Sequence, residues 1–592
     1  MCKKIIFSLF LCSSCYFVQG QQSFKPVPDN LKDAYKYNLQ KNFFNTEKDF
    51  NSYLIKFNNK LTAFGSLLNK TNSSQNLERL TQSLSRLEYD FRKMDLYLFL
   101  QYAINITNEK ASLLEDSIYD AIAKQRNRYK NNIKTASSKS IKELMALSSM
   151  KPYQYYLNNI ISSKTHELSP AEISLTNPFN YLKNNRYYDD LVNTIPTDSI
   201  YTLTDTLDLF NDMAAWQNHP DSTVRIDGER KLYKSYATVA TPLAFRYIQM
   251  IKGLNAFSIA KKYENLIQEN CYKLSLPEST LQAIFKEIEA NALVFKEFNK
   301  KNTDEISRYS ISTSTEILLN SFTQLGQDYH TKAVQLLDPT NGRLDIVGGP
   351  NRMSLQGAAS VYPIDVSTFY ANNYSGYYID IMLLAHEAGH AIQASLMYDN
   401  KVSLLNSSGP GYFTESFGKF NELLVSYNLY ENSKNAEQRK FYGAKYIERL
   451  LGLFGSTQEA AIEYNLIRGI ITDQLTSPSD LDSTTFSIES NYNDFSKSPE
   501  QKGLWMRLET NFKAPMHNIN DMVASLLAIH YFKQFVNNKI QFAEKYNYFL
   551  RNGYNNTPSN LLKVFMNIDM NNKDFCTVAI SFIKAALDKL RN

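Results

Sequence analysis

Hydrophobic positions recur at helical spacing along most of the chain. Between residues 31 and 150 they form successive amphipathic stretches, and the clearest of these runs from residue 77 to residue 98. Its apolar residues follow one another at steps of three or four: Leu77, Leu80, Leu84, Leu87, Phe91, Met94 and Leu98. Because this period places them on one face of a helix, the segment is predicted to belong to the core of a helix bundle.

The pattern changes twice further along the chain. Pro170, Asn177-Pro178 and residues 193–198 supply helix breakers and cap residues, which predicts a loop-rich stretch. Helical spacing resumes near Asp227 and continues to about Leu337.

A turn signal at residues 338–342 precedes a segment with a different sequence pattern. Residues 343–347, 358–362 and 366–370 carry β-branched and aromatic side chains at the spacing of strands. Helical pattern then returns from Ile379 to the C-terminus. The predicted fold class is therefore mainly α, with a small β-sheet inserted before a long helical region.

The first twenty residues have the character of a targeting segment. Lys3 and Lys4 precede a mostly apolar run at residues 5–11, and small residues end the segment before Gln21. This pattern is typical of a secretory signal peptide, so the mature protein is expected in the periplasm or outside the cell. An alternative is a lipoprotein anchored at Cys15. No later segment reaches the roughly 18 apolar residues needed to span a bilayer, so no transmembrane segment is expected.

Composition and charge narrow the class of protein. Tyrosine and phenylalanine are abundant, at 40 and 35 residues, whereas glycine and proline number 20 and 17, which favours long helices. The net charge is +5 and no block of Lys and Arg stands out, so nucleic acid is not expected as a partner. Outside the leader the cysteines are Cys271 and Cys576, which could pair in an oxidising compartment but do not make a disulfide framework.

Residues 383–393 carry the clearest chemical signal and read LLAHEAGHAIQ. On a helix, His386 and His390 lie one turn apart on the same face, so both imidazoles can bind one metal ion. Glu387 follows the first histidine, where it can accept a proton from an attacking water without binding the metal. The chain has only seven histidines, which makes a chance pairing at this spacing rare.

A hydrolytic zinc site needs three protein ligands and one open position. Residues 409–424 read GPGYFTESFGKFNELL, and Glu415 lies 25 positions after His390. The Gly-Pro-Gly turn lets the chain reverse and bring this helix to the first. Glu422 lies two turns after Glu415, where it can accept a hydrogen bond from a ligand histidine. The sequence therefore predicts one Zn²⁺ ion bound by His386, His390 and Glu415.

These motifs make the chain resemble the oligoendopeptidase F and thimet oligopeptidase group of zinc peptidases. Residues 338–391 contain GRLDI, QGAASVYP and NNYSGYYIDIMLLAHEAGHA, which are similar to that group's approach to its zinc helix. FTESFGKFNE at residues 413–422 is similar to its second helix. Residues 152–175, PYQYYLNNIISSKTHELSPAEISL, resemble a region of the oligoendopeptidase F branch, so the likeness covers most of the mature chain.

The resemblance implies a two-lobed helical body with a deep channel, zinc at its floor and a preference for short peptides. We divide the chain into a signal peptide at 1–20, an N-terminal helical domain at 21–205 and a catalytic zinc-peptidase domain at 206–592. An extended substrate could pair with the small sheet near Ser360 by strand addition, whereas folded proteins would be excluded.

The resemblance also implies a late segment that stabilises the oxyanion, and here that segment reads KAPMHNINDMVASLLAIHYF. His517 matches the group's histidine and is predicted to be catalytic. Met522 and Leu526 stand where tyrosines are expected, which leaves Tyr531, Tyr427 or another tyrosine as a substitute. Loss of one oxyanion donor can cost about 10²–10³ in rate.

The predicted function is zinc-dependent endopeptidase action on short unstructured peptides, with Glu387 as the general base. One alternative is a peptidyl-dipeptidase, which removes dipeptides from C-termini. The other is a catalytically idle peptide-binding protein with the same fold, against which the complete set of His386, His390, Glu415 and Glu387 argues.

Overall fold

The computed structural model describes residues 35–168, 172, 186–203, 205–210, 212–217, 219, 221–298, 308–349, 351–353, 357–371, 374, 376–492 and 503–591. Helices dominate these residues, which confirms the predicted fold class. The leader predicted at residues 1–20 lies outside the described residues, so export stays a prediction. The predicted helix breakers Pro170 and Asn177-Pro178 also lie outside them. None of the helices in the described ranges combines the length and apolar character that a bilayer-spanning segment needs.

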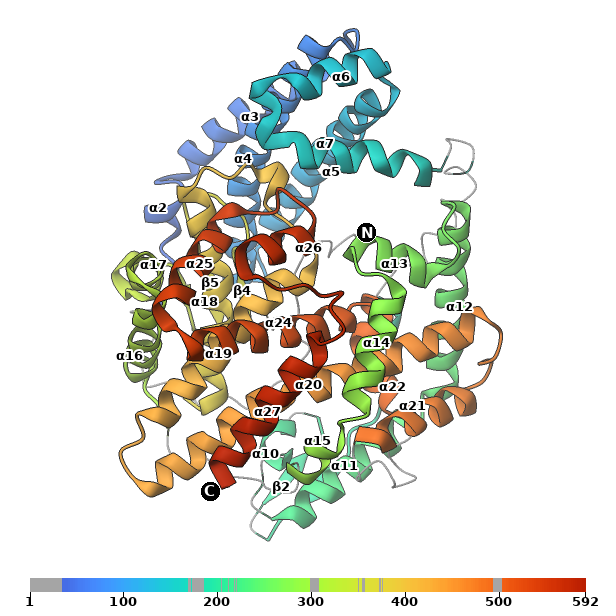
Figure 1. The fold of residues 1–592 in the computed structure, drawn as a ribbon, viewed down its shortest axis with the longest axis vertical. Coiled ribbons are helices and arrows are strands. Elements are labelled where there is room, and N and C mark those ends of the chain that lie inside the picture. Colours follow the sequence, from blue (N-terminus) through green and yellow to red (C-terminus); the bar gives the residue numbers. More distant parts are fainter. Residues whose placement is uncertain are drawn as a thin grey trace.

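The first helices form a lobe at one end of the molecule, drawn in blue and cyan at the top of Figure 1. They are α2 (Leu39–Asn42), α3 (Glu47–Leu67), α4 (Ser74–Ile104), α5 (Glu109–Thr135), α6 (Ser138–Ala146) and α7 (Gln154–Ser162), with the short 3₁₀ turns η1 (Ser148–Tyr153) and η2 (Ser163–His166). Thr46 and Asp49 start α3 with a capping box. The predicted apolar stripe lies on α4 and all seven of its side chains are buried, which confirms the helix-bundle prediction.

The larger body below this lobe contains the remaining helices (Figure 1). Its first part comprises α9 (Arg186–Val192), α10 (Met213–Gln217), α11 (Ser222–Ala237), α12 (Ala240–Ala260), α13 (Leu266–Leu274), α14 (Glu278–Glu289), α15 (Leu293–Phe298), α16 (Ile311–Phe322), η4 (Thr323–Leu325), α17 (Gln327–Leu337) and η5 (Pro339–Asn341). Its second part comprises α18 (Tyr378–Asp399), η6 (Leu404–Asn406), α19 (Gly411–Glu431), α20 (Ala436–Ile471), α21 (Pro478–Tyr492), α22 (Leu504–Arg507), α23 (Glu509–Lys513), α24 (Asn518–Asn537), α25 (Lys539–Asn552), α26 (Pro558–Leu561), η9 (Leu562–Met566) and α27 (Phe575–Arg591). Helix α19 packs against α18, α20 and α24, so it lies at the centre of this body.

The predicted small sheet is present, with shorter strands than the sequence suggested. Strands β3 (Leu344–Asp345), β4 (Gly357–Ala359) and β5 (Phe369–Ala371) are arranged in the order β3-β5-β4. β5 pairs parallel with β3 and antiparallel with β4, which leaves β4 at an edge. A hairpin of β1 (Ser199–Tyr201) and β2 (Thr206–Asp208) was not predicted.

Two hydrophobic cores hold the molecule together. The smaller core joins the side chains of α3–α7 and also takes in Ile364 and Val366, from the loop between β4 and β5. The larger core extends through the body and includes Tyr188, Ile195 and Ile200. These three residues precede position 206, and the division into domains at 205 stays a prediction.

Two further expectations differ from the structure in detail. The short helices α9 and α10 precede Asp227, and the longer helix α11 begins at Ser222, five residues before it, where Asp221 caps α11 by accepting a hydrogen bond from the Thr223 backbone N–H. Cys271 and Cys576 are buried free thiols, so they do not form the disulfide that an oxidising compartment would allow.

Candidate metal centre

Helix α18 presents the two predicted histidine ligands side by side. His386 and His390 are one turn apart, their ring centroids are 4.8 Å from each other, and the rings are almost perpendicular at 84°. Both side chains are almost fully buried, with exposed fractions of 2% and 4%. The helix is apolar on most of its surface, so burial of this face follows from the sequence around the motif.

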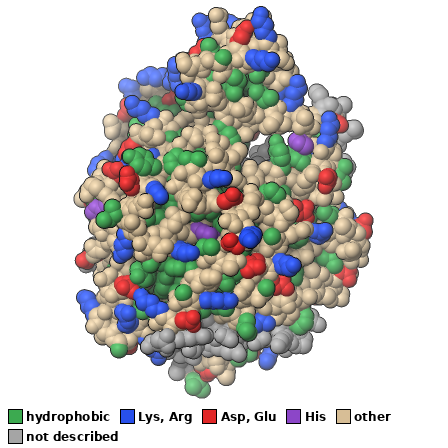
Figure 2. Space-filling model, in the orientation of Figure 1, with side chains coloured by type: hydrophobic (Ala, Val, Ile, Leu, Met, Phe, Trp, Pro, Cys, Tyr) green, Lys and Arg blue, Asp and Glu red, His purple; other side chains and the backbone are tan. Residues whose placement is uncertain are grey.

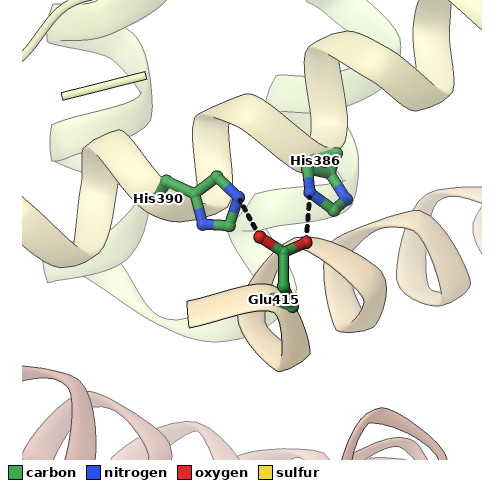
Figure 3. Close-up of side chains that lie close together, drawn as sticks. All are labelled: His386, His390 and Glu415. Atoms are coloured by element: carbon green, nitrogen blue, oxygen red, sulfur yellow. Dashed lines mark ion pairs between the residues drawn. The ribbon is translucent and has the colours of Figure 1, made fainter. Parts of the chain in front are cut away.

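Glu415 enters from α19, between the two imidazoles (Figure 3). One carboxylate oxygen lies 3.2 Å from His386 Nε2 and the other lies 3.9 Å from His390 Nε2. The three ligand atoms all lie within 4.8 Å of one another. A tetrahedral ion with ligand bonds of 2.0–2.2 Å would hold such atoms about 3.4 Å apart, so the set has the dimensions of a metal site.

The chemistry of Glu415 also fits a cation. Its side chain has no exposed surface, and neither carboxylate oxygen accepts a hydrogen bond from the described residues. A buried carboxylate without such bonds is costly unless a positive charge compensates it. The residues present therefore fit a metal ion, which the two neutral imidazoles and the carboxylate would hold together.

Two glycines and an asparagine allow α18 and α19 to approach closely enough for this geometry. A Cβ on Gly418 would lie 2.7 Å from His386 ring atoms, and a Cβ on Gly389 would lie 3.0 Å from the Phe417 carbonyl. Asn421 is fully buried and donates a hydrogen bond of 3.0 Å to the Ala385 carbonyl on α18. These contacts thus fix the crossing of α18 and α19 directly beside the candidate metal ligands.

A chain of polar contacts orients His386 from behind. Its Nδ1 lies 2.8 Å from Glu422 Oε1, so a proton on Nδ1 is donated to that carboxylate and Nε2 is left for the metal. Arg449 on α20 donates to the other Glu422 oxygen at 2.9 Å. The contact of Glu422 with a ligand histidine is as predicted. Arg449 was missed, because no local spacing connects it to the motif.

Glu387 lies on the side of the site that faces the small sheet. It is 4% exposed, and a Cβ on Gly357 of β4 would lie 2.6 Å from its Oε1. Glu387 and His390 line a pocket. The other lining residues come from α4, from β4 and the residues that follow it, from the residue before β5, and from the N-terminal segment: Tyr37, Arg92, Asp95, Leu96, Phe99, Leu100, Ala358, Ala359, Ser360, Val361, Tyr362 and Thr368.

His517 lies immediately before α24, is partly buried, and is not among the described residues that line this pocket. The carboxylate of Glu463 accepts hydrogen bonds from the backbone N–H groups on either side of it, those of Met516 at 2.6 Å and Asn518 at 3.1 Å. Burial raises the pKa of Glu463 to about 8. The catalytic role of His517 stays a prediction.

The residues considered for the missing tyrosines lie in packed surroundings. Met522 and Leu526 are fully buried. Tyr531 is also fully buried, among the rings of Phe417, Phe420 and Tyr546. Tyr427 lies beside Tyr446 and Phe532. Neither Tyr531 nor Tyr427 is among the described residues that line the pocket with Glu387.

Comparison with known proteins supports the fold. No protein-family model matches the sequence. No curated protein is significantly similar to it. Solved structures are similar over almost the whole chain, however. A protein from Chlamydophila abortus, provisionally described as a peptidase, has a TM-score of 0.78 and 17% identity, and the alignment covers 96% of this chain and 99% of that one.

Two further structures carry specific peptidase names. Oligoendopeptidase F from Enterococcus faecium has a TM-score of 0.65 and 15% identity, with coverage of 92% and 98%. PZ peptidase A has a TM-score of 0.67 and 14% identity, with coverage of 91% and 97%. The chain therefore has the fold of the oligoendopeptidase F structures. The resemblance that the motifs indicated is confirmed at the level of the fold.

Proposed function

We propose that this protein is a zinc-dependent peptidase that hydrolyses short, unstructured peptides. The observation that carries the proposal is the buried set of His386, His390 and Glu415, with Glu387 next to His386 in the sequence and in the lining of a pocket. The shared fold with oligoendopeptidase F supports the same reading.

Two imidazoles and one carboxylate are the ligand set of hydrolytic zinc sites, in which the fourth position stays open. When bound, zinc lowers the pKa of a coordinated water toward about 7 and polarises a substrate carbonyl. His386 is held in one orientation by Glu422 at 2.8 Å, which fixes the tautomer that binds metal through Nε2.

Glu387 performs the proton transfers in this proposal. It accepts a proton from the attacking water and delivers it to the nitrogen of the leaving amine. Its place between the metal ligands and β4 puts it next to any peptide that binds along the strand.

Strand β4 provides the surface along which a peptide would lie. It is the edge strand of its sheet, so its outer backbone groups are available for an added strand. Helix α4 of the N-terminal lobe also lines this pocket. We propose short or unfolded peptides as substrates because an extended chain can pair with an edge strand, whereas a folded domain cannot.

The test uses purified full-length protein, metal analysis and a length series of quenched fluorescent peptides, with and without chelator. We expect one zinc per chain, cleavage of short peptides that chelator abolishes, and weak cleavage of long chains. Glu387→Gln should retain zinc and lose activity, whereas Glu415→Gln should lose both. Normal activity of Glu387→Gln would refute the assignment of the base.

Product lengths from one defined peptide distinguish the two forms of the activity. Internal cuts indicate an endopeptidase, and successive dipeptides released from the C-terminus indicate a peptidyl-dipeptidase. A protein that binds zinc and peptide but leaves every peptide intact would refute the proposed hydrolysis.

A further inference from the structure

The pocket beside Glu387 contains a tyrosine from a distant part of the chain. Tyr37 lies just before α2 and lines the pocket together with Glu387, His390 and Thr368. Its hydroxyl oxygen is buried and forms no hydrogen bond with the described residues that meets the usual distance and angle limits. The Thr368 side chain lies close enough for hydrogen bonding to lower the pKa of Tyr37, an effect smaller than that of burial. A buried tyrosine hydroxyl usually has a partner, so a bound ligand is the natural candidate here.

The position of Tyr37 is fixed by its backbone. Its N–H donates to Asp345 Oδ2 at 3.2 Å, and Asp345 is itself held by Arg352 at 2.6 Å. The next residue, Asn38, donates from its N–H to the Gly342 carbonyl at 3.0 Å. Gly342 has a φ of +59°, and a Cβ there would lie 2.6 Å from the Asn38 nitrogen, so this close approach requires glycine. The segment around Tyr37 is therefore attached to the strand region that borders the site.

Two other tyrosines near the sheet, Tyr370 and Tyr374, have backbone carbonyls as partners. Tyr370 donates to the Met353 carbonyl at 3.0 Å, and Tyr374 donates to the Tyr309 carbonyl at 2.8 Å. The hydroxyl of Tyr546 also has no partner among the described residues, but its ring packs against those of Phe420 and Phe542. Tyr37 differs from Tyr546 because its hydroxyl, with Thr368 beside it, belongs to a side chain that lines the pocket.

The chemistry of the pocket suits a peptide backbone. Ser360 also lines it, and its buried Oγ forms no hydrogen bond with the described residues. Burial, followed by the negative charge of Asp345, raises the pKa of Tyr37 well above its ordinary value, so its hydroxyl keeps a proton to donate. Peptide carbonyls are acceptors that such a donor would satisfy.

We propose that Tyr37 contacts the substrate, and that its hydroxyl donates a hydrogen bond to a carbonyl of the peptide bound beside Glu387. The inference rests on the proposed peptidase function and deepens it, because it assigns a substrate contact to the N-terminal segment. It also supplies a tyrosine to the site from outside the late segment, where Met522 and Leu526 stand.

The test compares Tyr37→Phe with Tyr35→Phe in the full-length, zinc-loaded protein. Tyr35 belongs to the same segment, but its side chain is buried in the larger core and does not line the pocket. Both variants lose one oxygen atom, so folding and zinc content should match the wild type. We expect kcat/KM for a fluorogenic peptide to fall about 5- to 100-fold for Tyr37→Phe, the range for a buried acceptor that loses its donor. Tyr35→Phe should stay within twofold of the wild type.

The separate parameters show where the contact acts. A rise in KM alone indicates a bond made equally in the bound substrate and the transition state, whereas a fall in kcat indicates a bond that strengthens as cleavage proceeds. Tyr37→Phe with wild-type kcat/KM would overturn the inference while leaving the peptidase function intact. A wild type that cleaves no peptide would overturn the function and, with it, the inference.

Discussion

Gly418 is the residue whose replacement should most directly test how the metal centre is built. A Cβ at this position would lie 2.7 Å from both Cε1 and Nδ1 of His386 and 2.8 Å from its Cδ2. The imidazole therefore lies with its face against the glycine, on a helix whose position is fixed by Asn421. In Gly418→Ala the ring or the helix has to move.

The size of this movement follows from the contact distances. Ordinary van der Waals contact begins near 3.4 Å, and 3.4 minus 2.7 gives a displacement of about 0.7 Å. Metal sites tolerate ligand displacements of only about 0.2 Å. The same movement would stretch the 2.8 Å contact between His386 Nδ1 and Glu422. Loss of such a supporting partner alone costs about 10- to 100-fold in metal affinity, so we expect Gly418→Ala to bind zinc at least about 100-fold more weakly.

Zinc affinity can be measured by competition with a chromophoric chelator, with thermal unfolding as the measure of folding. The matched control is Gly452→Ala on α20, where a Cβ meets nothing within 4 Å. This control should bind zinc normally and gain up to about 1 kcal/mol from higher helix propensity. A zinc affinity of Gly418→Ala within threefold of the wild type would refute the close-contact account of the site.

Three further substitutions test other parts of the structure. Gly357→Ala places a Cβ 2.6 Å from Glu387 Oε1, so kcat should fall by up to about 10²-fold while metal analysis still finds full zinc. Arg449→Met removes the 2.9 Å contact to Glu422, and chelator competition should show about tenfold weaker zinc binding. An unchanged zinc affinity would mean that Arg449 does not support the site. Burial raises the pKa of Glu489 from near 4.5 to about 8. Between these pH values the folded state keeps a proton that the unfolded state loses. The free energy of unfolding therefore falls as pH rises, by up to about 1.4 kcal/mol per pH unit. Glu489→Gln should flatten this slope in denaturant unfolding from pH 5 to pH 8, and an equal slope in both proteins would contradict the assignment.

The parts of the site that depend on local spacing could be predicted from the sequence. His386 and His390 share a helix face because the helical period puts residues four apart next to each other. Glu415 and Glu422 lie two turns apart on one face of α19 for the same reason. Once Glu415 reaches the histidines, Glu422 is therefore also directed towards α18. The apolar stripe of α4 is also local, and it was correctly predicted as buried core.

The contacts that depend on tertiary packing could not be predicted. Arg449 follows Glu422 by 27 residues and reaches it only because α19 and α20 pack together. Tyr37 and Glu387 are 350 positions apart, and their proximity depends on the hydrogen bonds between the N-terminal segment and the strand region. The β1–β2 hairpin was not predicted because its strands have only three residues each and no strong turn sequence such as Asn-Gly connects them.

The loop between β4 and β5 has a mechanical consequence for the whole molecule. Ile364 and Val366 are packed into the smaller core, and Asp365 forms an ion pair of 2.6 Å with Lys93 on α4. Figure 2 shows a gap between the upper lobe and the lower body on one face, so the lobes are not in contact everywhere. Any rotation of the upper lobe would pull on this loop and displace β4, along which the substrate is proposed to lie. The position of the upper lobe and the affinity for peptide would then be thermodynamically linked. The free energy by which a bound peptide shifts the equilibrium between lobe positions would equal the free energy by which the lobe position changes peptide binding.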